Sequence, residues 1–264
     1  MEFRRSSGTA SSALAGLVSS GLEDLDKILG GIPIGSALLV GHTCLLGRAF
    51  CSMFASEGLH AGHRVVILGW PALALPRKTI KKEKKAEEMS IAWRYEQQGA
   101  RSKVKGWDFA REVQPELAVL VERPEELAAG LGDPKGPVLR VILAADADPL
   151  RDAAAIRSAA RNAIKTLRSW GGRFVLFVTS NSSVFSEQEF LALARLFDGV
   201  LRVTEFRSDV EKAPFGSFDG TLFLERRPGK GKAPETKNFL LRVGSRTGIE
   251  LEPLSLGPES ARLL

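Results

Sequence analysis

Cysteine and histidine are scarce in this sequence, and their positions exclude several classes of function. The two cysteines are Cys44 and Cys51, and the three histidines are His42, His60 and His63. They form no CxxC pair and no set with zinc-ligand spacing, so no metal site is predicted and both thiols are expected to stay reduced inside a cell. No GxSxG motif and no nucleophile–base arrangement is present, which removes the usual signals of acyl-transfer catalysis.

Long apolar runs are also missing from the chain of 264 residues. No run approaches the roughly 18 to 20 residues that span a bilayer, so no membrane segment is expected. Residues 1–19 are rich in serine and alanine and predict a disordered N-terminal tail rather than a signal peptide. Residues 20–259 are expected to form one domain, and the net charge of +6 permits an anionic partner such as nucleic acid.

One stretch, residues 20–50, organises the rest of the chain. Ser20 followed by Glu23 has the spacing of a capping box and predicts a helix from Gly21, which Gly30 and Gly31 end. A Gly/Pro turn leads into a buried strand at residues 36–40, and a loop then enters a second helix at 47–61. This order of elements is typical of a nucleotide-binding α/β protein.

Strands and helices alternate through the first two hundred residues, which predicts a mostly parallel sheet with helices on both faces. Further strands are expected at residues 63–70, 138–145, 174–179, 200–206, 221–225 and 239–243. Further helices are expected at 113–129, at 149–170 and, after a second capping box at Ser186, up to Phe197. The last strands and the hairpin between them indicate an antiparallel edge.

The loop at the phosphate-binding position departs from the pattern GxxxxGK[ST]. Gly41 and Gly47 are one residue too far apart, Arg48 stands where a lysine is expected, and Ala49 replaces the hydroxyl that would hold Mg²⁺. Asp146, after the third buried strand, is either a Walker-B-like acid or a turn aspartate. ATP hydrolysis by this loop alone is therefore not expected.

Two basic segments are candidates for RNA binding. Four cations share one stripe of the helix at 149–170 at spacings of four, four and three residues: Arg157, Arg161, Lys165 and Arg168. The hairpin RRPGKGKAPETK carries five more: Arg226, Arg227, Lys230, Lys232 and Lys237. The helix stripe could equally meet an acidic protein face or remain a solvated surface. Trp93, Arg94 and Tyr95 are interpreted as core or interface residues, with base stacking as the alternative.

Several motifs, in order along residues 20–259, resemble one known family. The opening SGLEDLDKILGGIPIGSALLVG is similar to RecA/KaiC-type domains, in which a helix and a Gly/Pro turn precede the phosphate loop. MSIAWRYEQQ, KGWDFAREV, PFGSFDGTLFLE and FLLRVGSRTGIELEPLSLGPE are similar to motifs of the Elongator complex protein 4 (PAXNEB) family. The resemblance implies a RecA-like, P-loop NTPase-like fold with degenerate Walker motifs.

The resemblance also implies a non-catalytic subunit of the Elongator complex, present in the cytoplasm and also in the nucleus. Such a subunit joins Elongator proteins 5 and 6 in a hetero-hexameric ring that binds tRNA and supports wobble-uridine modification. No intrinsic cofactor is expected, and ATP at the subunit interfaces of the ring stays open. The alternatives are an active RecA/KaiC-type ATPase with an atypical loop and a scaffold that binds neither ATP nor RNA.

Overall fold

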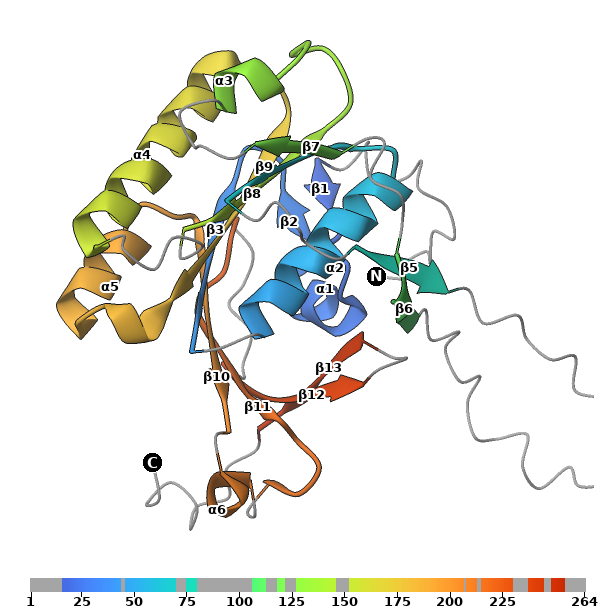
Figure 1. Cartoon of the computed structure of the whole chain (residues 1–264), viewed down its shortest axis with the longest axis vertical. Helices are drawn as coiled ribbons and strands as arrows, with labels where there is room; N and C mark the ends of the chain where they lie inside the picture. The colour runs from blue at the N-terminus through green and yellow to red at the C-terminus, as the bar shows by residue number, and fades with distance from the viewer. Residues whose placement is uncertain are drawn as a thin grey trace, which may run out of the picture.

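The structure, a computed structural model, is a nine-stranded sheet with helices on both faces (Figure 1). It describes residues 16–43, 46–69, 75–79, 106–112, 118–121, 127–145, 152–206, 208–212, 215–229, 237–244 and 248–254. Within these residues no helix is long and apolar enough to cross a membrane.

The strands and helices alternate as the sequence predicts. The strands are β1 (Leu17–Val18), β2 (Ile32–Pro33), β3 (Ala37–His42), β4 (Arg64–Leu68), β5 (Pro76–Thr79), β6 (Gly106–Glu112), β7 (Ala118–Val121), β8 (Leu139–Ala144), β9 (Phe174–Asn181), β10 (Gly199–Glu205), β11 (Gly220–Arg226), β12 (Asn238–Gly244) and β13 (Gly248–Pro253). The α-helices are α1 (Glu23–Leu29), α2 (Leu46–His60), α3 (Leu127–Gly130), α4 (Ala153–Trp170), α5 (Glu187–Ala194) and α6 (Asp209–Lys212).

The main sheet has the strand order β13-β12-β11-β10-β3-β9-β8-β4-β7. The six strands from β10 to β7 pair in parallel, whereas β10 to β13 pair antiparallel. The predicted fold class is therefore confirmed, including its antiparallel C-terminal edge. Strand β3 lies inside the sheet between β9 and β10, so the loop after β3 opens at the carboxyl edge of the parallel part.

The two faces of the sheet bury separate apolar cores, because alternate residues of a strand point to opposite faces. On one face α1 and α2 pack over Leu38, Val40 and Phe177. On the other face α4 and α5 pack over Leu39, Leu176 and neighbouring residues. The parallel strands are buried on both faces, which explains their continuous apolar runs in the sequence.

Helix α1 begins differently from the expectation. Its N-cap is Leu22, with no capping bond from a side chain, so the predicted capping box of Ser20 and Glu23 does not form. The carboxylate of Asp26 instead accepts bonds from Ser19 Oγ at 2.5 Å and from the Ser20 amide at 2.6 Å. Burial raises the pKa of Asp26, and these bonds oppose that rise.

Three further expectations need correction. Ala118–Val121 is strand β7, paired in parallel with β4, and not part of a helix at 113–129. Leu17–Val18, placed in the N-terminal tail, pairs with β2, so ordered structure begins before Ser20. β13 was not expected as a strand and forms one edge of the sheet. By contrast, the left-handed Gly30 ends α1 and the capping box of Ser186 and Glu189 opens α5, both as predicted.

Arg140 is the largest fully buried side chain among the described residues, with 1% of its surface exposed. It extends from β8 beneath α2, where its Nη1 donates to the carbonyl of Phe54 at 2.9 Å and its Nε donates to Nδ1 of His63 at 2.9 Å. The guanidinium also lies 4.6 Å from the centroid of the Phe54 ring. Burial lowers the pKa of Arg140 to about 10, while nearby Glu57 and Asp26 favour its charged form.

Replacing Arg140 with methionine should strongly destabilise the fold. The change keeps much of the volume but leaves Glu57 and Asp26 without their buried counter-charge, a loss of about 3 kcal/mol. Urea unfolding measures it, with Arg161→Met on the exposed face of α4 as a control expected within about 0.5 kcal/mol of the parent. An Arg140→Met protein as stable as the parent would contradict the structural role of this charge.

The stability of the fold should decrease as the pH falls from about 6.5 to 4. Burial, with smaller contributions from Arg140 and Arg173, lowers the pKa of His63 from 6.5 to about 4. The unfolded chain therefore takes up a proton in this window that the folded chain does not, which favours unfolding by about 2 kcal/mol after allowance for partial exposure. His63→Gln keeps an acceptor for Arg140 and should flatten this part of the curve. Equal pH dependence in both proteins would exclude His63 as the cause.

Candidate functional site

The candidate nucleotide site lies where β3 ends and α2 begins, at the carboxyl edge of the parallel strands. Ligands of open α/β sheets bind at such edges, and a helix N-terminus there attracts anions. β9 lies beside β3 and ends in polar residues, with Ser180 opposite Gly41 and Asn181 opposite His42. Proteins with this arrangement of strands and helix can bind phosphate groups at this edge. Whether this chain has room for one depends on which atoms occupy the space beside the first turn of α2.

The imidazole of His42 fills the space beside the first turn of α2. His42 is the last residue of β3 and only 4% of its surface is exposed. Its ring lies so close to Gly47 that a Cβ atom at that position would overlap Cδ2, Cγ and Nε2. The Ser182 hydroxyl donates to the carbonyl of His42 at 3.2 Å, which joins the end of β3 to the segment after β9. A side chain of the chain itself therefore packs where a phosphate loop would enclose its ligand.

Gly41 has a packing role as well. It lies in β3 on the face covered by α5, and a Cβ atom there would come 2.6 Å from Cε2 of Phe190. The same Phe190 ring has the guanidinium of Arg202 at 4.2 Å from its centroid. Each of the two glycines that suggest a phosphate loop thus has an aromatic side chain packed closely against it: His42 against Gly47 and Phe190 against Gly41.

The remaining residues of the loop do not restore the missing phosphate chemistry. Arg48 is exposed on α2, and Ala49 offers no hydroxyl for a metal-bound phosphate. Asp146 lies outside the described residues, so its interpretation as a Walker-B-like acid stays a prediction. Within the described residues no three His, Cys, Asp or Glu side chains gather as metal ligands would.

Two hydroxyl groups at the end of β9 lie buried near the same edge. Thr179 and Ser180 are fully buried, and within the described residues neither side-chain oxygen has a hydrogen-bond partner. They point to opposite faces of the sheet, because they are consecutive in a strand. Sequence reasoning did not single out these residues, since a hydroxyl inside an apolar strand gives no motif.

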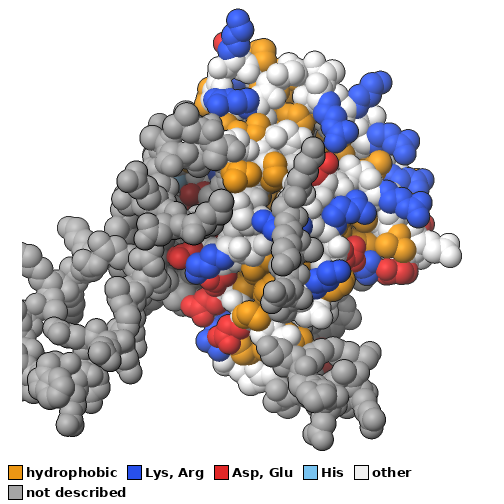
Figure 2. Space-filling view, turned by 180° about the vertical axis from the view of Figure 1, so that it is seen from behind, with side chains coloured by type: hydrophobic (Ala, Val, Ile, Leu, Met, Phe, Trp, Pro, Cys, Tyr) orange, Lys and Arg blue, Asp and Glu red, His pale blue; other side chains and the backbone are white. Residues whose placement is uncertain are grey.

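The four cations of α4 are arranged as the sequence predicts. Arg161, Lys165 and Arg168 are exposed and Arg157 is half-buried. The opposite face of the helix is buried and consists of Ile156, Ala160, Ala163, Ile164 and Leu167. Figure 2 shows Lys and Arg side chains gathered along the edge of the molecule where α4 lies.

The base of the hairpin between β11 and β12 is anchored to the body of the protein. Nη1 of Arg226 donates to the carbonyls of Ala194 and Phe197, at 3.3 and 3.0 Å, after the end of α5. Nε of Arg227 donates to the carbonyl of Leu29 at 2.7 Å, at the end of α1. Both arginines meet helix C-termini, where a positive charge is favourable.

Lys237 is exposed at the other strand of the hairpin, next to the start of β12. Lys230 and Lys232 lie outside the described residues, as do Trp93, Arg94 and Tyr95. Their proposed roles therefore stay predictions.

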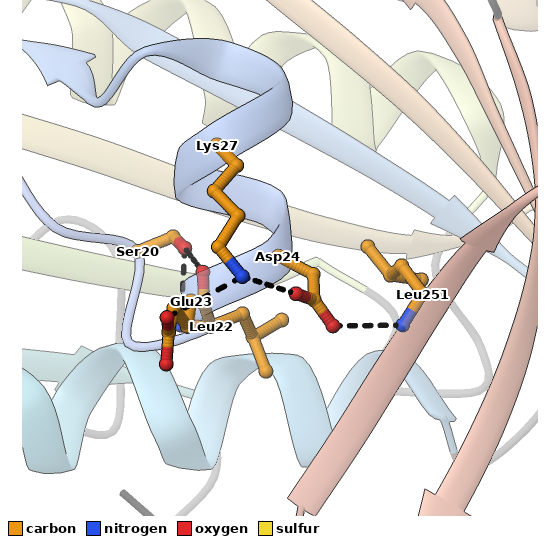
Figure 3. A network of polar contacts seen from close by, with 6 residues as sticks. All are labelled: Ser20, Leu22, Glu23, Asp24, Lys27 and Leu251. Atoms are coloured by element: carbon orange, nitrogen blue, oxygen red, sulfur yellow. Dashed lines mark hydrogen bonds and ion pairs between the residues drawn. The ribbon is translucent and has the colours of Figure 1, made fainter. Parts of the chain in front are cut away.

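The opening helix contacts the C-terminal motif directly (Figure 3). Oδ2 of Asp24 on α1 accepts a bond from the amide of Leu251 on β13 at 3.2 Å. Asp24 also forms an ion pair with Lys27, which is 3.0 Å away. Leu251 begins the LEPLSLGPE motif, so the two ends of the family resemblance meet in the fold. The contact occupies an outward backbone amide of an edge strand, and Pro253 removes a second one, which protects this edge from pairing with another chain.

Comparison with known proteins finds one family that resembles part of the chain. Residues 4–116 match the family model for PAXNEB protein. Over this part, which is less than half of its length, the chain is similar to the PAXNEB family. The match includes IAWRYE and KGWDFAREV, two of the motifs that carry the resemblance, and it ends before the C-terminal ones. No curated protein sequence matches the chain.

Comparison with a solved structure confirms the fold of the chain. The chain superimposes on a KaiC-like protein from the hyperthermophilic archaeon Pyrococcus horikoshii OT3 with a TM-score of 0.52 and 16% sequence identity. The alignment covers 90% of this chain and 99% of the archaeal one. At this identity the likeness shows the RecA/KaiC-type fold and not the activity.

Gly47→Ala should destabilise the protein only while His42 is present. Alanine at position 47 overlaps the imidazole, and overpacking of this kind costs about 1–3 kcal/mol. In a His42→Ala background the same change should be neutral or stabilising by about 1 kcal/mol, because alanine favours a helix over glycine. Chemical unfolding of the four proteins measures the coupling. Additive effects would show that the ring does not occupy this space.

Proposed function

We propose that the chain is a non-catalytic, RecA-like subunit of the Elongator complex. In this proposal it joins Elongator proteins 5 and 6 in a hetero-hexameric ring, and the ring binds tRNA and supports modification of the wobble uridine. The ring, the partners and the RNA follow from the similarity of residues 4–116 to the PAXNEB family. The chain contributes a RecA-type surface for assembly and basic groups for RNA.

One observation carries the non-catalytic part of the proposal. The RecA-like frame is kept, with β3 inside the sheet and α2 after it, but His42 packs against Gly47 where a phosphate loop would be open. A working loop needs a compact lysine ammonium for the phosphates and a hydroxyl for Mg²⁺. Arg48 and Ala49 provide neither, which supports an accessory role.

The proposal leaves a place for ATP in the assembled ring. RecA-like rings bind nucleotide between protomers, so an inactive loop in one subunit is compatible with hydrolysis at boundaries formed by others. This chain would then supply an edge of such a site without its own cofactor. The hairpin, with Lys230, Lys232 and Lys237, would contact the tRNA backbone.

Affinity purification of the full chain from its native cell tests the assembly. Two other RecA-like proteins should copurify in equal amounts, and the isolated complex should bind tRNA. Quantitative mass spectrometry measures the stoichiometry, and size-exclusion chromatography with light scattering measures the mass expected of a hexamer.

Absence of those partners would contradict the proposal. So would ATP hydrolysis by the purified chain alone that Arg48→Ala abolishes, because it would establish the alternative of an active ATPase with an atypical loop. If the complex has the expected composition but binds no tRNA, the chain is an assembly scaffold, and the RNA-binding part of the proposal is wrong.

A further inference from the structure

The exposed face of α4 has an unusual composition for a surface helix. Within Ala153–Trp170 there is no acidic residue. The exposed positions hold either cations or short side chains, the latter being Ala154, Ala155, Ser158, Asn162 and Ser169. The cations therefore project above a low surface that a bulky ligand can approach closely.

The cations are spaced along the helix axis rather than clustered. Arg157 and Arg168 are eleven residues apart, which corresponds to about 16 Å at 1.5 Å per residue. This length is enough to follow several successive phosphates of one strand of a duplex. Among the described residues, three acids lie near the row: Asp152 at the N-cap, Glu189, which attracts Arg157, and Asp198, which is 3.8 Å from Arg168.

The fold brings this row next to the hairpin, which is 58 residues further along the chain from Arg168 to Arg226. Arg168 lies 3.8 Å from Oδ2 of Asp198, in the turn between α5 and β10. Arg226 bonds to the carbonyl of Phe197 in the same turn. Arg195 is exposed there as well. The row on α4 and the base of the hairpin thus meet at residues 195–198.

We propose that these cations form one continuous surface that binds the phosphate backbone of double-helical RNA. The surface consists of Arg157, Arg161, Lys165, Arg168, Arg195 and Arg226, and we refer to it as the α4 track. The inference rests on the proposed function for the identity of the RNA, and it assigns the contact to a defined face of this chain. Arg168 and Asp198 form an exposed ion pair, and the Asp198 carboxylate also accepts from the amide of Ala37 at 2.9 Å.

The composition of the α4 track favours the backbone of a nucleic-acid duplex over single-stranded nucleic acid and over a protein partner. Single-stranded nucleic acid is held by aromatic side chains on which bases stack. The one aromatic residue of α4, Trp170, is half-buried, packs against the apolar core and donates from Nε1 to the carbonyl of Gly132 at 3.0 Å. A protein partner needs apolar anchors at the centre of its interface, and the large exposed apolar residues of the described chain are Val184, Leu191, Phe223 and Val243, none of them on α4. Cations over short side chains are sufficient for phosphates, which carry no sequence information.

The test measures binding of the full chain, alone and in its purified complex, to a 16-base-pair RNA duplex and to a 16-nucleotide single strand. Arg161→Gln with Lys165→Gln removes two exposed cations of the track and keeps good helix formers. The matched control, Lys27→Gln with Lys212→Gln, removes the same charge from α1 and α6. Arg161→Lys with Lys165→Arg keeps the charge.

The track variant should weaken duplex binding about tenfold at 0.1 M salt and reduce the slope of log K against log salt by about 2. The control and the charge-keeping variant should stay within about twofold of the parent, and the single strand should bind more weakly than the duplex. Unchanged duplex affinity and slope in the track variant would overturn the inference. Loss of a protein partner by this variant, with RNA binding intact, would do so in favour of an acidic protein surface.

The two proposals fail separately. A complex that binds tRNA equally well with and without the track would leave the proposed function standing and refute the α4 track. A chain that binds duplex RNA through the α4 track but copurifies with no RecA-like partner would support the α4 track and refute the proposed function.

Discussion

The position of α2 on the sheet depends on one buried cation. Apolar packing holds a helix against a sheet but is not directional, whereas the hydrogen bonds of Arg140 are. One bond reaches the carbonyl of Phe54 within α2 and the other reaches His63 just after it. Gly58 provides room, since a Cβ atom there would come 2.5 Å from Cδ of Arg140. If α2 slid or rotated, the guanidinium of Arg140 would lose these bonds while still buried in the core. Arg140 therefore favours one position of the helix on the sheet.

That constraint extends to the opposite end of the same helix. With its C-terminal half fixed by Arg140, α2 presents its first turn to the end of β3, where the ring of His42 packs against Gly47. In a nucleotide-binding relative the phosphates themselves would contact this turn. Here the packing of His42 on Gly47 occupies the space at this turn, and Arg140 holds the other half of the helix. Contacts within the chain therefore fix α2 on the sheet at both its first turn and its second half.

The sequence predicted what depends on local pattern and missed what depends on distant neighbours. Continuous apolar runs identified the parallel strands, and Gly30 identified the end of α1. Ser20 and Glu23 had the spacing of a capping box, but Asp26 bonds to Ser19 and Ser20 instead, a competition that spacing does not reveal. Residues 118–121 form a short apolar run, which is ambiguous between helix and strand. Arg140 lies inside an apolar run, where the sequence gives no sign of its buried hydrogen bonds. The packing roles of Gly41 and Gly47 cannot be predicted without knowing which rings face them.

The fold also decides where charge remains available. In open α/β proteins the ligand site lies at the carboxyl edge of the sheet, but there His42 and Phe190 turn inward to pack on glycines. The exposed cations lie on the outer face of α4 and continue to the opposite, amino edge, where Arg226 starts the hairpin. The row of cations on α4 and the base of the hairpin are each short, and the turn at 195–198 joins them into one surface. The chain thus fills the carboxyl edge beside β3 with its own side chains and keeps a separate row of exposed cations on α4.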